Sequence, residues 1–113
     1  MIARFWRGVT QAKDYRAYLE YMTGTGVQEI LKIKGNQGIY LLHRVDDDEA
    51  EFVFISFWDS YDSIRKFAGP DVEIPVYYPE DRKYLLTLES KARHYELAKF
   101  DTAKREGAGI PAK

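Results

Sequence analysis

The sequence predicts a single α+β domain, in which strands and helices follow one another in the order β-α-β-β-α-β. Three observations support this class. The chain has 113 residues, enough for one hydrophobic core but not for two. Apolar residues recur at every second position in some segments and at helical spacing in others. Turn-forming glycines and prolines separate these segments. This order is typical of the ferredoxin-like arrangement, a four-stranded antiparallel sheet with both helices on one face.

The first third of the chain predicts a strand followed by an interrupted helix. Residues 2–10 are rich in β-forming side chains and predict the first strand. Residues 12–22 predict a helix, because their apolar side chains fall on one helical face at Tyr15, Tyr18, Leu19 and Met22. Gly24 and Gly26 are expected to interrupt this helix, and a second apolar turn follows over residues 27–31.

The middle of the chain predicts a hairpin followed by a second helix. Residues 39–45 and 51–58 predict two strands, joined by an acidic tip at residues 46–48. Asp59 or Ser60 is placed to cap the next helix, whose apolar side chains are Ile64, Phe67 and Ala68. Gly69-Pro70 ends this helix.

The last third predicts packed turns, a strand and a tail. Residues 71–84 are rich in proline and tyrosine, so short helical turns are expected. Residues 85–95 alternate well enough for a fourth strand. Because the segment beyond Lys99 has little apolar content, we expect a domain over residues 1–98 and a mobile tail over residues 99–113.

Both faces of the predicted sheet are apolar. On the third strand, Phe52, Phe54 and Trp58 point one way, whereas Val53, Ile55 and Phe57 point the other. An antiparallel sheet with one wet face should instead alternate apolar and polar residues. An uncovered apolar face would exceed the patch size usual for monomers, so we expect a two-fold homodimer with sheets packed face to face.

The composition excludes several classes of function. Seventeen basic and 18 acidic residues give a net charge of −1, so nucleic acid is not expected as a partner. There is no cysteine, which excludes disulfides and thiolate chemistry. Neither a signal peptide nor a membrane-spanning segment is present, so we expect a soluble, cytoplasmic protein without a membrane partner.

The strand-to-helix junction carries a resemblance to a known family. The junction Phe57-Trp58-Asp59-Ser60, with Ile64 and Phe67 behind it, and a closing strand that ends His94-Tyr95-Glu96 resemble the antibiotic biosynthesis monooxygenase (ABM) superfamily. The likeness covers residues 1–97. It implies the dimeric α+β barrel fold and a pocket between helices and sheet. The family includes cofactor-independent monooxygenases of polycyclic phenols, haem-degrading monooxygenases, quinol oxygenases and members without a known reaction.

The haem-degrading branch of this family is not matched. Its pattern is an Asn on the first strand, a Trp on the second helix and a haem-ligating His about ten residues later. In this sequence the Trp position falls on Phe67 and the His position near Tyr77, and the first strand contains no Asn. Tyrosine can ligate haem iron, so haem binding stays open, but with this pattern absent we expect neither haem nor another cofactor.

The same resemblance indicates where a pocket would lie. Phe67 and Tyr77 fall at its cavity positions, with Arg7 and Tyr78 as companions. Such a lining would suit a planar phenolic or anionic ligand, with Tyr77 and Arg7 as the candidate catalytic residues. The candidate substrate-binding residues are Phe67, Tyr78, His94 and Trp58. Alternatively, these tyrosines are core residues with their hydroxyl groups at the surface.

The two histidines are expected on opposite edges of the sheet. In the predicted strand order 4-1-3-2, His43 lies on one edge strand and His94 on the other, so they cannot share a metal within one subunit. Each is either a core or interface residue, or part of a proton relay across the dimer. No carboxylate pair or histidine spacing predicts a metal site.

Three functions remain open from the sequence. The first is a cofactor-independent monooxygenase or related oxidoreductase that acts on a small aromatic substrate such as a phenol or quinol. The second is a non-catalytic small-molecule-binding module of the same fold. The third is a structural dimer whose pocket is filled by side chains.

Overall fold

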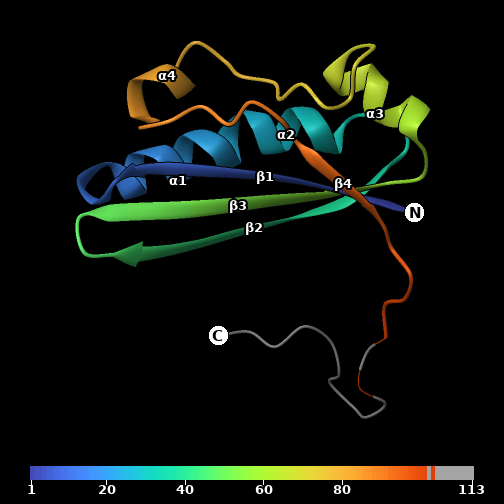
Figure 1. The fold of residues 1–113 in the computed structure, drawn as a ribbon, viewed down its shortest axis with the longest axis horizontal. Coiled ribbons are helices and arrows are strands. Elements are labelled where there is room, and N and C mark those ends of the chain that lie inside the picture. Colours follow the sequence, from blue (N-terminus) through green and yellow to red (C-terminus); the bar gives the residue numbers. More distant parts are fainter. Residues whose placement is uncertain (102, 104–113) are drawn as a thin grey trace.

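The structure, a computed structural model, describes residues 1–101 and 103. A four-stranded sheet has the strand order β2-β3-β1-β4, and the helices lie on one side of it (Figure 1). The expected α+β fold and strand order are therefore confirmed. The elements are β1 (Ile2–Gln11), a 3-10 turn (Ala12–Asp14), α1 (Tyr15–Gly24), α2 (Gly26–Leu31), β2 (Asn36–Asp46), β3 (Glu49–Trp58), α3 (Tyr61–Ala68), α4 (Asp81–Tyr84) and β4 (Arg93–Glu96).

The centre of the sheet is the long antiparallel pair of β1 and β3. The two strands pair without a break from Ile2 opposite Trp58 to Gln11 opposite Glu49. β2 joins β3 through a tight hairpin, and Asp47 adopts a positive φ of 57° at its tip. Asp is among the few residues that tolerate this left-handed conformation, which explains why an acidic run can form the turn.

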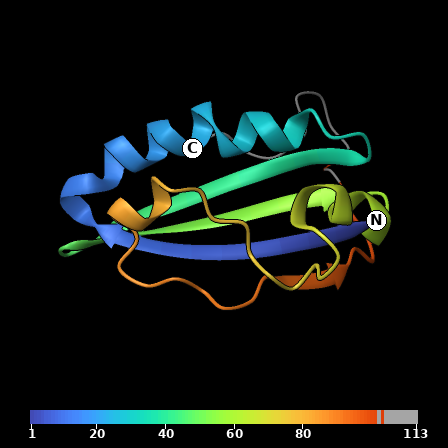
Figure 2. The same cartoon turned by 90° about the horizontal axis from the view of Figure 1, so that it is seen from above.

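The helices cover one face of the sheet and enclose the core. Figure 2 shows α1 and α2 running over the sheet, beside the segment that leads from α3 to α4. Thr25 separates α1 from α2, and its Oγ1 donates a hydrogen bond to the Tyr21 carbonyl over 2.6 Å. Ser60 caps α3 by accepting a 3.2 Å bond from the Ser63 amide, as expected. The fully buried core side chains include Trp58, Tyr18, Phe52 and Ile64.

The segment of residues 71–84, called the strap below, crosses the helix-covered face. It contains the short helix α4, in agreement with the turns expected there. The strap is tied to the rest of the domain at both ends. Near its start, Arg4 donates hydrogen bonds to the Val72 and Ile74 carbonyls. Near its end, the Asp81 carboxylate accepts a 2.9 Å bond from the Tyr18 hydroxyl.

The fourth strand is much shorter than expected. The prediction of a strand over residues 85–95 is wrong, because β4 spans only Arg93–Glu96 and a single bridge joins Leu85 to Thr10. The Leu86 amide still donates to the Val9 carbonyl of β1 over 2.9 Å, but the Ala92 amide donates to the Glu73 carbonyl of the strap over 2.7 Å. The Glu89 carbonyl accepts from the Tyr77 hydroxyl over 2.8 Å.

The sheet face away from the helices carries a broad apolar surface, called the open face below. Its side chains pack across strands: Phe5 meets Tyr95 edge-on at 5.3 Å between ring centroids, and Tyr40 meets Phe57 at 5.5 Å. Leu42 is 52% exposed and Tyr95 is 53% exposed. The described part of the chain thus contains the two-sided apolar sheet that the alternation predicts.

None of the helices within residues 1–101 is long and apolar enough to cross a membrane. Most of the tail expected over residues 99–113 lies outside the described residues.

Candidate functional site

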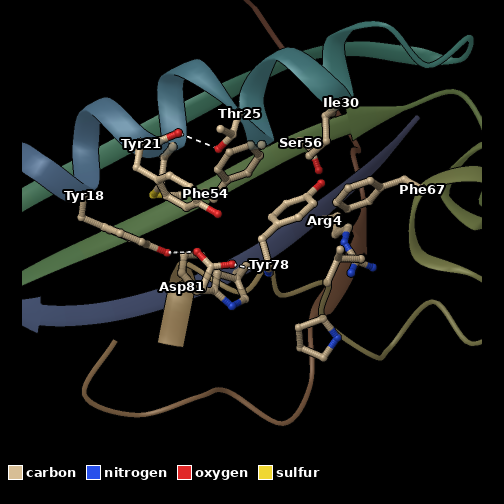
Figure 3. Close-up of a pocket in the computed structure, with 15 residues that line it drawn as sticks. Arg4, Tyr18, Tyr21, Thr25, Ile30, Phe54, Ser56, Phe67, Tyr78 and Asp81 are labelled. Carbon is tan, nitrogen blue, oxygen red and sulfur yellow. Dashed lines mark hydrogen bonds between the residues drawn. The ribbon is translucent and has the colours of Figure 1, made fainter. Parts of the chain in front are cut away.

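A cavity of about 80 Å³ lies between α1, α2, β1, β3 and the strap (Figure 3). Its wall is mainly apolar, and its aromatic members are Trp6, Tyr18, Tyr21, Phe54, Phe67 and Tyr78. The polar groups at its wall are Arg4, Thr25, Ser56 and Asp81. Figure 3 shows Arg4, Ser56, Phe67 and Tyr78 converging at one end, with Tyr18 and Asp81 at the other.

The floor of the cavity follows from strand alternation. Arg4 lies opposite Ser56 and Trp6 opposite Phe54 in the β1–β3 ladder. Because successive side chains on a strand point to opposite faces, all four reach the helix-covered side. The Trp6 ring also lies across Gly8, where an added Cβ would come within 2.2 Å of the ring atom Cη2. Gly8 therefore gives Trp6 the room to lie along the cavity floor.

Arg4 is a buried cation at this cavity. Only 5% of the residue is exposed. Its guanidinium group donates to the Val72 carbonyl and, over 3.2 Å, to the Ile74 carbonyl, and it lies 2.9 Å from His94 Nε2. The guanidinium carbon is 5.9 Å from the centroid of the Phe67 ring. Within the described residues Arg4 forms no ion pair with a carboxylate.

The charge state of Arg4 follows from its surroundings. Burial lowers the pKa of Arg4 to about 10, so the side chain stays cationic at neutral pH. A guanidinium group has five N–H donors, and three are used by the contacts above. Two donors, the Nε–H and one Nη2–H, thus have no partner within the described residues. The end of the cavity formed by Arg4 and Tyr78 therefore favours an anionic oxygen.

The opposite end is closed by Asp81, which accepts from the Tyr18 hydroxyl and, over 2.7 Å, from the Tyr78 amide. Both carboxylate oxygens are thus engaged within the protein. Burial raises the pKa of Tyr18 strongly, and the Asp81 charge adds to this effect. Burial also raises the pKa of Tyr78. These two hydroxyl groups remain protonated at neutral pH, and the single donor of Tyr18 is already used by Asp81.

The predicted site residues come together only in part. Phe67 and Tyr78 line the cavity, whereas Tyr77 lies behind its wall. The Tyr77 hydroxyl accepts a 3.1 Å bond from Trp6 Nε1 and donates to the Glu89 carbonyl. Trp58 is fully buried beneath Phe67, with the two rings stacked at 6.3 Å, and its Nε1 donates to Ser56 Oγ over 2.8 Å. These two residues therefore support the wall from outside.

The position expected for Arg7 is corrected by the structure. Arg7 lies on the open face, where it pairs with Glu51, which also binds Arg44 over 2.7 Å. The physical reason is alternation, since Arg7 follows Trp6 and must point to the other side of the sheet. Arg4, two residues before Trp6, supplies the positive charge instead. Ile2, Arg4 and Trp6 share one parity in the sequence, but the sequence alone does not show which parity faces the helices.

Asp81 and Tyr21 also reach the cavity and had no signal in the sequence. Asp81 comes from the strap, whose path over the sheet no local pattern reveals, and Tyr21 comes from α1. The two histidines lie on opposite edge strands, as expected: His43 contacts the Tyr15 hydroxyl over 3.2 Å, whereas His94 contacts Arg4. Among the described residues, no group of three or more potential metal ligands is clustered.

Comparisons with known proteins support the fold. No family model matches the sequence, and no curated protein matches it either. Among solved structures, the chain is similar to a Bacillus cereus protein described as a candidate antibiotic biosynthesis monooxygenase. The TM-score is 0.60 at 17% sequence identity, and the match covers 90% of this chain and 97% of the other. The chain therefore has an ABM-like fold, as its resemblance implied.

Proposed function

We propose that the protein is a cofactor-independent monooxygenase that oxidises a small phenol or quinol-like substrate in the cavity beneath the strap. The observation that carries this proposal is the buried guanidinium of Arg4 in an aromatic cavity. A cation without a carboxylate partner favours the phenolate over the neutral phenol, and the phenolate is the form that reacts with O₂. The fold of the Bacillus cereus protein supports the same class of reaction.

The proposed reaction uses O₂ as the only oxidant. The phenolate, held at Arg4, gives one electron to O₂, and the resulting superoxide joins the ring carbon opposite the hydroxyl group. That carbon loses its proton while the O–O bond breaks, so one oxygen stays on the ring as a quinone carbonyl and the other leaves as water. Phenol and O₂ thus give quinone and water, with every electron supplied by the substrate. The protein binds the anion and limits the access of water.

The size of the cavity limits the substrate. Its volume of about 80 Å³ is below the roughly 150 Å³ of an engineered cavity that binds benzene. A single ring therefore requires a small outward shift of the strap, and a tricyclic phenol would require much more. We propose a single-ring substrate for this reason.

Oxygen uptake tests the proposal. Chelator-treated protein, incubated with single-ring phenols and quinols, should consume one O₂ per phenol and form the quinone absorbance. Arg4→Met should reduce the rate by about 100-fold or more, since it removes the group that stabilises the anion. Arg16→Met, which changes an exposed arginine on α1, is the matched control and should keep the rate. No turnover of any substrate, or equal rates in Arg4→Met and wild type, would contradict the proposal.

A non-catalytic binding module is the second candidate, and the tyrosines favour it. Burial raises the pKa of Tyr77 and of Tyr78, so neither hydroxyl acts as a base near neutral pH. A module of this kind would bind the same aromatic anions with the same dependence on Arg4, but without oxygen uptake. The test above therefore separates the two candidates.

We further propose that the protein is a homodimer in which two open faces pack together. The open face includes Phe5, Tyr40, Leu42, Val53, Ile55, Phe57 and Tyr95. Burial of this apolar surface supplies the driving force, and a two-fold axis would place the same surface on both subunits.

A further inference from the structure

The contact between Arg4 and His94 fixes the proton state of the histidine. Arg4 Nη1 and His94 Nε2 are 2.9 Å apart and lie on paired residues of β1 and β4. A guanidinium group can only donate, so Nε2 must accept and carries no proton. His94 is therefore neutral, with its proton on Nδ1.

Three groups from other elements face His94. Arg4 comes from β1, the Tyr61 ring of α3 lies 5.7 Å away, and Glu73 of the strap is a nearby carboxylate that also pairs with Lys91 over 3.7 Å. Burial and the Arg4 charge lower the pKa of His94, and the Glu73 charge only partly opposes them. The positive charge of Arg4 thus acts directly against protonation of the ring.

We propose that binding of an organic anion at Arg4 is coupled to proton uptake by His94. The inference rests on the proposed function, because it concerns the same anion site. A carboxylate or phenolate at the two remaining Arg4 donors offsets the guanidinium charge, which after burial is the second cause of the lowered pKa of His94. The ring then takes up a proton, turns its Nε2–H away from Arg4 and adds a second positive charge beside the anion.

This coupling assigns a role to His94, which lies outside the cavity wall. His94 is a positioning residue: when neutral it holds Arg4 through one hydrogen bond, and when protonated it strengthens the field at the anion. Proton uptake on binding makes the affinity for the anion depend on pH. If one proton is taken up per anion, the affinity rises up to tenfold for each unit that the pH falls within the titration range of His94. A phenol that binds as its anion releases a proton, and the uptake at His94 balances that release.

Calorimetry with benzoate as the probe tests the coupling, because its carboxyl group stays ionised above about pH 5. Titrations at one pH in two buffers with different ionisation enthalpies give the number of protons taken up. For wild-type protein we expect proton uptake on benzoate binding and an affinity that rises as the pH falls below about 7, because the pKa of His94 lies below its ordinary value of 6.5 in the free protein. His94→Gln keeps an acceptor for Arg4 but cannot titrate, so it should bind benzoate without proton uptake.

His43→Gln is the matched control, because this histidine lies on the far edge strand and contacts Tyr15. It should retain the proton uptake of the wild type. Benzoate that fails to bind, wild-type binding without proton uptake, or unchanged uptake in His94→Gln would each overturn the inference. A protein that shows the coupling but consumes no O₂ would instead contradict the proposed oxygenase and leave the coupling in place.

Discussion

Arg4 is a buried cation that the fold satisfies with carbonyl oxygens and a histidine nitrogen. Buried charges are usually paired with an opposite charge, because removal from water costs several kcal/mol that neutral partners offset only in part. At Arg4 the described residues provide no such charge. An anionic ligand would complete the pairing, and this connects the local electrostatics with the proposed function.

Gly8 controls the shape of the cavity through Trp6. Gly8→Ala would place a methyl group within 2.2 Å of Cη2 of the Trp6 ring, which must then move toward the ligand. We expect a loss of stability of about 1–3 kcal/mol from overpacking and weaker binding of benzoate. Urea denaturation and calorimetry measure the two effects.

Gly24→Ala is the matched control for this substitution. Gly24 lies at the end of α1, and an added Cβ there meets no atom within 4 Å. Its stability should stay the same or rise by up to about 1 kcal/mol, because alanine favours a helix. Equal losses in both variants would show that the Trp6 contact is unimportant.

Only some of the residues that line the cavity could be identified from the sequence. The resemblance places Phe67 and Tyr77 at cavity positions with Tyr78 as a companion; Phe67 and Tyr78 line the cavity, whereas Tyr77 does not. The cationic residue could not be identified from the sequence. The choice between Arg4 and Arg7 requires knowing which alternate side chains of β1 point toward the helices. Trp6 shows which side chains point toward the helices only after its contacts with Tyr77 and Gly8 are known.

At the scale of elements, the strap is the part that closes the cavity, and Asp81 holds its second half. Asp81→Ala would leave the buried Tyr18 hydroxyl and the Tyr78 amide without their acceptor. We expect a loss of about 2–4 kcal/mol and faster hydrogen exchange in the strap, because unsatisfied buried donors are costly.

Asp62→Ala is the corresponding control, since its side chain is 89% exposed and pairs only with Arg65 on α3. Such a surface pair contributes about 1 kcal/mol or less. If Asp81→Ala were no more destabilising than Asp62→Ala, Asp81 would not anchor the strap.

The order of elements could be predicted because each has a local signal. Ser60 marks the start of α3, and the glycines around Thr25 mark the break between α1 and α2. The extent of β4 had no such signal. Residues 87–92 alternate in sequence, but their backbone bonds go to Glu73 and Tyr77 of the strap, contacts that depend on tertiary structure.

At the scale of the whole molecule, the open face leads to a prediction about assembly. Light scattering at micromolar concentration should give about twice the chain mass of 13.2 kDa. Leu42→Lys places a charge on the open face and should shift the protein toward the monomer. Leu31→Lys changes a leucine of α2 that is 48% exposed and should leave the dimer intact. A wild-type monomer would contradict the proposed packing.

The central claim is that Arg4 makes the cavity selective for an aromatic anion, and the titration of bound 4-nitrophenol tests it most directly. Absorbance reports the ionisation of the bound probe without any need for turnover. We predict that wild-type protein binds the phenolate at least about tenfold more tightly than the neutral phenol. The bound probe should therefore ionise at lower pH than the free probe. Arg4→Met should lose this preference. Equal affinity for both forms, or tighter binding of the neutral phenol by the wild type, would contradict the account.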